Sequence, residues 1–197
     1  MKKIIFASKN KGKVKEVVQI LNGLNIAIIS LTDMNEQIKI KEDGDSFEAN
    51  ALIKAKLVYN KFKLPTIADD SGLVVEQLNG APGIYSARYA GEDGNDKANN
   101  KKLLEELKNY PEPHIAKFVC AAVYYAGEEI HTAIGEFKGR MIDEERGTHG
   151  FGYDPLFIPD GYSISSAEMN PELKNSISHR FNAFNKLKKY LINEHLI

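Results

Sequence analysis

Two adjacent carboxylates follow a short apolar run in the segment IADDSG, residues 67–72. The ends of strands in open α/β sheets are where ligands bind, and Asp69 and Asp70 come directly after a predicted strand. The two carboxylates repel each other, and in a loop that turns directly through Ser71 and Gly72 a bound cation would ease that repulsion. Mg²⁺ suits this position because it takes oxygen ligands from one or two carboxylates and from substrate phosphates. An ordinary turn with a capping aspartate is the alternative.

A lysine-rich loop, SKNKGK at residues 8–13, lies between the first predicted strand and its helix. The backbone N–H groups at a helix N-terminus are unpaired and carry partial positive charge. Together with Ser8, Asn10 and three lysines they predict a cradle for phosphate. The loop lacks the spacing of a Walker A motif, so a solvated basic loop is the competing interpretation.

A third group of polar residues surrounds the start of the second predicted helix. Glu48 has a structural explanation as the capping-box partner of Asp45, and Asn50 could be a helix-surface residue. Glu42 precedes the helix and has no such explanation, although a loop carboxylate is more often solvated than catalytic. Lys54 lies on the same helix.

Aromatic and basic residues gather near the end of the sequence. The glycine-flanked FGYD loop offers Phe151 or Tyr153 as a face on which a nucleic-acid base could stack, unless these rings anchor the loop to the core. His179 and Arg180 open the last predicted helix, where the helix dipole opposes cations. An anion or an acceptor-rich ligand is therefore expected to face them.

The turn-rich segment GAPGIYSARY, residues 80–89, leaves two functions open. Ser86 and Arg88 could donate hydrogen bonds to a phosphate. The segment could equally fold the chain back on the core.

The predicted elements place these residues on an α/β scaffold. Strands are expected at 4–7, 26–30, 66–68, 73–78, 117–126 and 130–137. Helices are expected over Val14, Val17, Val18 and Leu21, from the capping box at Asp45 to Lys63, over 96–107, and through Ile177, Phe181, Phe184, Leu187 and Leu191. The last two strands are joined by a short glycine-containing connection typical of a hairpin. The sequence thus predicts a mixed sheet with flanking helices.

Composition limits the classes of function. The 197 residues are 43% hydrophobic and form one predicted domain, 1–197. Asp plus Glu number 27 and Lys plus Arg 26, so no net field attracts a long polyanion and a nucleic-acid partner is not expected. The single cysteine, Cys120, lies in an apolar run and indicates a reducing compartment. The apolar run after MKK is shorter than a signal peptide needs, and no membrane span is visible. A soluble cytoplasmic protein is expected.

Taken together and in this order, SKNKGK, the KEDG loop before FEANA, IADDSG, GAPGIYSARYAGEDG, GTHGFGYDPLF and KNSISHR resemble the inosine triphosphate pyrophosphatase family. The resemblance runs from near Met1 to the last helix. It implies hydrolysis of deaminated purine nucleoside triphosphates (dITP, ITP and XTP) to a nucleoside monophosphate and pyrophosphate, which cleanses the nucleotide pool. It also implies an elongated mixed β-sheet with flanking helices, two lobes around a central nucleotide cleft, and a homodimer.

The resemblance also implies roles for individual residues. Asp70 matches the proton acceptor and a metal ligand, Glu42 matches a second acidic residue at the metal, and Asp69 is a supporting neighbour. The implied metal is Mg²⁺, with Mn²⁺ as a substitute. The triphosphate would be held by Ser8, Lys9, Asn10, Lys11, Gly12, Lys13 and Lys54, with Ser71 as a further substrate contact. The nucleoside pocket would comprise Phe151, Gly152, Tyr153, Asp154, Lys174, His179 and Arg180.

Base selection is expected to depend on the 6-position of the purine. Inosine and xanthosine carry a keto oxygen there, which His179 or Arg180 could satisfy, whereas the amino group of adenine would leave these donors unpaired. Guanine shares the keto group, and the sequence does not show how GTP is excluded. Two other functions stay open: a pyrophosphatase for modified pyrimidine triphosphates, and a nucleotide sensor without turnover.

Overall fold

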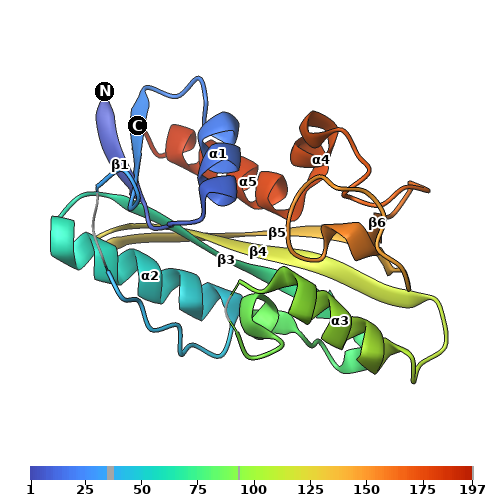
Figure 1. The fold of residues 1–197 in the computed structure, drawn as a ribbon. Coiled ribbons are helices and arrows are strands. Elements are labelled where there is room, and N and C mark those ends of the chain that lie inside the picture. The colour runs from blue at the N-terminus through green and yellow to red at the C-terminus, as the bar shows by residue number, and fades with distance from the viewer. Residues whose placement is uncertain (35–37, 93, 197) are drawn as a thin grey trace. The chain divides into compact units, whose positions relative to one another are not determined.

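The computed structural model describes residues 1–34, 38–92 and 94–196, which form a mixed α/β fold (Figure 1). The strands of this part of the chain form a six-stranded sheet in the order β2-β1-β3-β4-β5-β6. Their bounds are β1 Lys2–Phe6, β2 Ile26–Ser30, β3 Thr66–Val75, β4 His114–Ala126, β5 Glu129–Met141 and β6 Phe157–Pro159. The α-helices are α1 Lys11–Ile20, α2 Phe47–Phe62, α3 Asp96–Leu107, α4 Pro171–Ile177 and α5 His179–Asn193. Short 3-10 helices span Glu76–Leu78, Gly83–Arg88 and Asp154–Leu156.

The sheet combines both strand orientations. Strand β1 pairs in parallel with β2 and with β3, while β5 pairs antiparallel with β6. Strands β4 and β5 are neighbours joined by Gly127 and Glu128, and so short a connection fits only an antiparallel pair. The predicted mixed sheet with flanking helices and the predicted hairpin are therefore confirmed.

The chain divides into two compact units. Unit 1 comprises Met1–Asp70, Cys120–Gly135 and Arg180–Ile197, and unit 2 comprises Ser71–Val119 and Glu136–His179. Strands β3, β4 and β5 each contribute residues to both units. The prediction of a single folding unit with two lobes stays a prediction.

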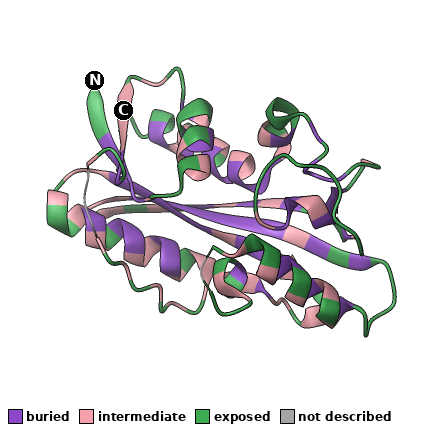
Figure 2. Cartoon of the chain, viewed as in Figure 1, coloured by how far each residue is buried: buried purple, intermediate pink, exposed green. Residues whose placement is uncertain are grey.

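Unit 1 has an apolar core on each face of its strands, because alternate side chains of a strand point to opposite sides. Ile4 and Phe6 of β1 pack with residues of α1 and α5, including Val17 and Phe184. Ile5 packs with residues of α2 in a separate core. The strands are accordingly buried between α1 and α5 on one side and α2 on the other (Figure 2).

Unit 2 has its own apolar core. Leu73 and Val75 of β3 belong to a buried cluster that includes Leu103 and Leu107 of α3. Phe157, on β6, belongs to the same cluster. The helix expected over 96–107 is confirmed as α3, and its two buried leucines lie four residues apart, about one helical turn.

Strand β3 corrects the prediction for the IADDSG segment. The sequence predicted a strand at 66–68, a turn through Ser71 and Gly72, and a new strand at 73–78. Instead, β3 runs without a break from Thr66 to Val75, and a 3-10 helix follows at Glu76. The segment stays extended because each aspartate finds cationic partners on its own face of the sheet, as described below, so no turn is needed.

Three helix predictions also require correction. Ser46, not Asp45, caps α2, since its side chain accepts a hydrogen bond from the Ala49 N–H. The expected last helix is divided at Ser178 into α4 and α5. On α1, Val18 is 47% exposed whereas Glu16 is buried, because Glu16 accepts a hydrogen bond from the buried Arg180 of α5.

Among the residues that the structure describes, none of the helices is both long and apolar enough to span a membrane.

Candidate active site

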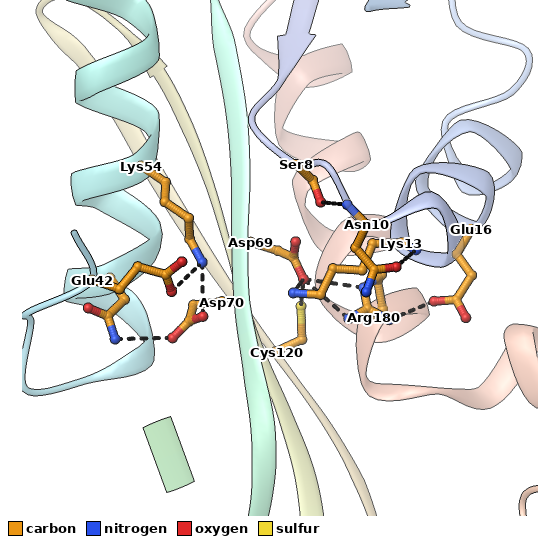
Figure 3. Close-up of polar contacts among 11 residues, drawn as sticks. Ser8, Asn10, Lys13, Glu16, Glu42, Lys54, Asp69, Asp70, Cys120 and Arg180 are labelled. Atoms are coloured by element: carbon orange, nitrogen blue, oxygen red, sulfur yellow. Dashed lines mark hydrogen bonds and ion pairs between the residues drawn. The ribbon is translucent and has the colours of Figure 1, made fainter. Parts of the chain in front are cut away.

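Asp69 and Asp70 direct their side chains to opposite faces of β3 (Figure 3). The residues before them show the alternation, since Ile67 belongs to the core shared with α1 and α5 while Ala68 belongs to the core shared with α2. Asp69 lies two residues after Ile67 and therefore points to the same face of β3 as Ile67. Asp70 lies two residues after Ala68 and points to the opposite face, with Ala68. The two carboxylates therefore belong to two different polar clusters in unit 1.

The Asp69 cluster joins α1, β3 and α5. The Lys13 ammonium lies 3.1 Å from Asp69 Oδ2, and Arg180 Nε and Nη2 both donate to the same oxygen at 3.3 Å. Arg180 Nη1 donates to Glu16 Oε2 at 2.6 Å. Arg180 is 1% exposed, and burial of a charge is tolerated only when it is paired and hydrogen-bonded. The cluster thus consists of two cations and two carboxylates fixed in place by one another.

The charges around Asp69 hold it ionised. Burial by itself raises the pKa of the Asp69 carboxyl, but Lys13, Arg180 and Lys54 outweigh burial and bring the pKa well below its ordinary value. Burial likewise opposes the charge of Arg180, and Asp69 is the main group that raises its pKa. Asp69 Oδ1 is buried and has no hydrogen-bond partner within the described ranges. Asp69 is an anchor for cations rather than a group that exchanges protons.

The SKNKGK loop leads into the N-terminus of α1, as predicted. Asn10 is the N-cap, and its side-chain oxygen accepts from the Lys13 N–H at 3.1 Å. Ser8 Oγ in turn accepts from the Asn10 N–H at 3.2 Å. The Lys13 side chain reaches from the first turn of α1 to Asp69, whereas Lys9 and Lys11 are exposed.

The Asp70 cluster joins β3, α2 and the loop before α2. Lys54 Nζ donates to Asp70 Oδ1 at 2.9 Å and to Glu42 Oε2 at 2.9 Å. Asn50, one turn earlier on α2, donates from Nδ2 to Asp70 Oδ2 at 3.3 Å and accepts from the Gly44 N–H at 2.9 Å. These contacts fasten the loop that carries Glu42 to the helix that carries Lys54.

Burial and neighbouring charges act in different ways on the pKa values of Asp70 and Lys54. Burial raises the pKa of the Asp70 carboxyl above its ordinary value, and Lys54 opposes this shift without cancelling it. Burial lowers the pKa of Lys54, but Asp70, Asp69 and Glu42 outweigh it and the net pKa is raised. Asp70 is thus a stronger base than an exposed aspartate, next to a lysine that stays charged.

The two carboxylates near Lys54 are the donors available to a cation on this face. In the described part of the chain, no three side chains of His, Cys, Asp and Glu gather closely enough to enclose a metal ion. Glu42 and Asp70 would thus provide a partial ligand set, and the remaining ligands would have to be water or substrate oxygens.

The FGYD loop is built around Asp154 in unit 2. Asp154 Oδ2 accepts from the Phe151 N–H at 3.0 Å and from Lys174 Nζ at 2.6 Å. The same ammonium lies 5.2 Å from the centre of the Phe151 ring. Phe151 is 39% exposed whereas Tyr153 is 4% exposed, so Phe151 is the ring that a ligand can reach.

Tyr153 is a core residue that ties the FGYD loop to the GAPGIYSARY segment. Its hydroxyl donates to the Ser86 carbonyl oxygen at 2.9 Å. Ser86 Oγ accepts from the Leu73 N–H at 2.9 Å and donates to the Gly83 carbonyl at 2.6 Å. Ser86 therefore has a structural position, and Arg88 stacks its guanidinium on the Tyr85 ring at 5.3 Å.

The remaining predicted site residues lie in unit 2. His179 is buried and stacks on Phe118 with ring centres 5.1 Å apart. The Gly152 N–H donates to Asp96 Oδ2 at 2.7 Å, which joins the loop to the first turn of α3. Ser71 is half-buried and directly follows Asp70 on β3.

A model of the Ham1 family matches residues 4–190 of the sequence. The chain belongs to the Ham1 family. A dITP/XTP pyrophosphatase of Oceanobacillus iheyensis is 47% identical over 194 residues, covering 97% of this chain and 98% of that protein. A dITP/XTP pyrophosphatase of Bacillus subtilis is 46% identical over 193 residues, covering 97% and 98%. The resemblance recognised in the sequence motifs is confirmed.

Solved Ham1 structures have the same fold. A Ham1 protein from Coxiella burnetii superimposes with a TM-score of 0.91 at 36% identity, covering 98% of this chain and 100% of that one. A Staphylococcus aureus Ham1 protein gives a TM-score of 0.89 at 39% identity, with the same coverage.

Two members of the clusters in this Ham1 protein were missed from the sequence. Glu16 is three residues after Lys13, which places both on one face of α1, and this spacing was the available signal. Cys120 directs Sγ toward Asp69 Oδ2 at 3.9 Å, and nothing in its apolar run indicated that contact. Asn50, which could have been a surface residue, is fully buried at Asp70.

Proposed function

We propose that this protein hydrolyses deaminated purine nucleoside triphosphates (dITP, ITP and XTP) to the nucleoside monophosphate and pyrophosphate. The Ham1 relatives named dITP/XTP pyrophosphatase support this substrate class. The observation that carries the proposal is the arrangement on β3, where Asp70 lies between Lys54 and Asn50 and its neighbour Asp69 holds Lys13. A basic carboxylate beside paired lysines suits attack by water on a polyphosphate.

Asp70 is the proposed proton acceptor. As the oxygen of a water molecule forms a bond to phosphorus, the bridging bond between the α- and β-phosphates breaks and pyrophosphate leaves. Asp70 takes the proton that the water loses, and its raised pKa makes this transfer easier than for an exposed aspartate. Lys54 and Lys13 offset negative charge on the phosphates, and the N-terminus of α1 adds its N–H groups.

The residues on the α2 face fit a Mg²⁺ ion. Glu42 and Asp70 present carboxylate oxygens, the donor type that Mg²⁺ and Mn²⁺ prefer, and two carboxylates plus phosphate oxygens form a usual set. When bound, such an ion would neutralise phosphate charge and lower the pKa of its water.

The purine base is assigned to unit 2 residues around Phe151. The exposed ring of Phe151 offers the stacking surface, and the contacts of Phe151 with Asp154 and Lys174 hold that ring in place. His179 is the proposed donor to the 6-keto oxygen of hypoxanthine or xanthine. Arg180, which was expected to share that task, has its guanidinium on Asp69 and Glu16, so we assign its main effect to the phosphate side through Lys13.

The test is pyrophosphate release from ITP, dITP, XTP, GTP and ATP, each at one concentration with Mg²⁺. ITP, dITP and XTP should be hydrolysed at least about tenfold faster than ATP, because the 6-amino group of adenine would leave a donor in the site unpaired and such a polar mismatch discriminates strongly. GTP, which shares the 6-keto group, is expected to be hydrolysed slowly as well, and its rate measures discrimination elsewhere on the base. Equal rates on all five would contradict the substrate class. Faster turnover of modified pyrimidine triphosphates would favour the second enzymatic function, and ITP left intact after long incubation would favour a sensor.

We further propose a homodimer in a reducing, cytoplasmic compartment. The homodimer rests on the sequence resemblance, and the compartment on the single buried cysteine. Light scattering of the purified protein would test the homodimer, and a monomeric mass at micromolar concentration would exclude it.

A further inference from the structure

Lys54 already occupies the position between the two carboxylates that would bind a metal ion. Its ammonium donates to Glu42 Oε2 and to Asp70 Oδ1, both at 2.9 Å. Its side chain is only 8% exposed, so water screens this charge weakly. Figure 3 shows the ammonium facing both carboxylates from α2. In electrostatic terms, Lys54 is the resident cation of the site.

The surrounding contacts keep Lys54 in this position. Asn50 binds the other oxygen of Asp70 and also the Gly44 N–H of the Glu42 loop. Both Asp70 and the loop are thereby oriented toward the Lys54 ammonium.

We infer that Lys54 competes with the divalent metal ion for Glu42 and Asp70, and that the site therefore binds metal tightly only together with a polyphosphate. This inference rests on the proposed function and adds an order of binding to it. The ammonium and the ion are both positive and would share the same two carboxylates at contact distance, where like charges repel strongly.

A polyphosphate resolves the competition because it offers anions to both cations. Its oxygens complete the ligand set that Glu42 and Asp70 leave unfilled, since the described residues place no third carboxylate, histidine or cysteine there. Its charge also gives the Lys54 ammonium an alternative partner. Metal ion and nucleotide should accordingly bind with positive coupling, and free metal alone should bind weakly.

The experiment measures binding of Mn²⁺ alone, by electron paramagnetic resonance, to protein without nucleotide. Lys54→Met removes the resident charge and keeps an unbranched side chain. It should bind Mn²⁺ at least about tenfold more tightly than the wild type, because one contact between like charges is lost. Lys56→Met is the matched control, since Lys56 lies on the same helix, is exposed and is near the Tyr125 ring. It should bind Mn²⁺ as the wild type does.

A second substitution tests whether the tighter Mn²⁺ binding of Lys54→Met depends on the two carboxylates. Adding Asp70→Asn to Lys54→Met should abolish the tighter binding. Lys54→Gln should reproduce the gain with a polar side chain, in case the methionine variant fails to fold. Folded Lys54→Met or Lys54→Gln protein that binds Mn²⁺ no more tightly than Lys56→Met would overturn the inference.

Crystals of the wild-type protein soaked in Mn²⁺ without nucleotide give a measurement that needs no variant. At millimolar Mn²⁺, Lys54 Nζ should still contact Glu42 and Asp70, with no ion on these carboxylates. An ion bound to both carboxylates while Lys54 keeps its two hydrogen bonds would contradict the competition. None of these measurements uses turnover, so a failure of the proposed function, seen as ITP left intact, is distinguishable from a failure of this inference.

Discussion

Asp69 and Asp70 are consecutive residues of β3, yet each forms an ion pair with a different lysine from a different helix. Asp69 binds Lys13 of α1 at 3.1 Å, and Asp70 binds Lys54 of α2 at 2.9 Å. The strand thus separates a cluster of ion pairs, in which the pKa of Asp69 is lowered, from a cluster in which the pKa of Asp70 is raised. Removing one or the other charge should consequently have different effects.

Asp70→Asn should remove turnover while leaving the fold intact. Loss of a general base lowers kcat by about 10²–10⁴-fold. The amide keeps the shape of the side chain and can still accept from Lys54, so the unfolding midpoint should change little. Steady-state kinetics on ITP and calorimetric titration with the nucleotide would separate turnover from binding.

Asp160→Asn is a suitable control because Asp160 is exposed and lies outside both clusters. It should keep wild-type kcat. An Asp70→Asn enzyme with near-normal kcat would remove Asp70 from the mechanism.

Asp69→Asn should destabilise the protein, because Arg180 and Lys13 lose a buried counter-charge. Breaking a buried ion pair from one side costs about 3–5 kcal/mol. The pKa of Asp69 in the folded state is below its unfolded value of about 3.9, so its stabilisation is complete above that pH and is lost as the pH falls further. Urea unfolding between pH 3 and pH 7 is the measurement.

The stability difference between wild type and Asp69→Asn should thus be constant near neutral pH and shrink below about pH 4. Asp43→Asn tests a surface pair, since Asp43 contacts Lys41 with both side chains exposed. Its unfolding midpoint should match the wild type. A pH-independent difference for Asp69→Asn would show that its charge does not stabilise the fold.

Phe151→Ala should weaken nucleotide binding more than it slows turnover. The exposed ring is the proposed stacking surface, and base stacking on an aromatic ring contributes about 1–3 kcal/mol. KM for ITP should rise by about 5- to 150-fold with kcat changed far less. Tyr110→Ala, which removes another ring of similar exposure, should leave KM unchanged. A KM for Phe151→Ala equal to that of the control would place the base elsewhere.

Gly150→Ala should disrupt the FGYD loop more than Gly152→Ala. Both glycines have positive φ, +80° and +62°, so each substitution introduces backbone strain of about 1–2 kcal/mol. A Cβ on Gly150 would also lie 2.1 Å from Asp154 Oδ2, whereas a Cβ on Gly152 meets nothing within 4 Å. The clash should add about 1–3 kcal/mol.

Urea unfolding of the two glycine variants gives the comparison. An equal loss of unfolding free energy in Gly150→Ala and Gly152→Ala would mean that Asp154 moves away from the new Cβ without loss of stability. In that case Lys174 and Phe151, which both contact Asp154, would not depend on its position.

Much of the scaffold followed from periodicity, because apolar residues at helical or strand spacing leave few alternatives. The helices α1 and α2 were expected for this reason, whereas the β4–β5 hairpin was expected from the short glycine-containing connection between two β-rich runs. The prediction of a turn in the IADDSG segment was wrong. Its polar composition suggests a turn, while the charges that keep it extended come from α1, α2 and α5. Such long-range pairing is invisible to local pattern.

The sequence predicted which residues belong to the site better than it predicted how they are arranged in space. Glu42, Lys54 and Asp70 were each named from the sequence, and the structure brings them together. Their separation from Lys13, which lies across β3, was not foreseen, because a turn was predicted at Ser71 and Gly72, directly after the two aspartates, and the alternation of a strand was not expected there. Tyr153 and Phe151 could not be distinguished from the sequence, because both are aromatic residues of one loop, and only their exposures of 4% and 39% separate the core ring from the accessible one.

Unit 1 is assembled from three separated stretches of chain, the last of which starts at Arg180. Asp69 therefore meets Arg180 only after 111 further positions of the chain have been made. A nascent polypeptide that has not yet reached α5 contains the lysines of residues 8–13 but lacks the guanidinium that pairs with Asp69 and Glu16. The ionic interior of unit 1 is thus completed by a late segment, and a polypeptide truncated before α5 should be cleaved by proteases more readily than one that includes it.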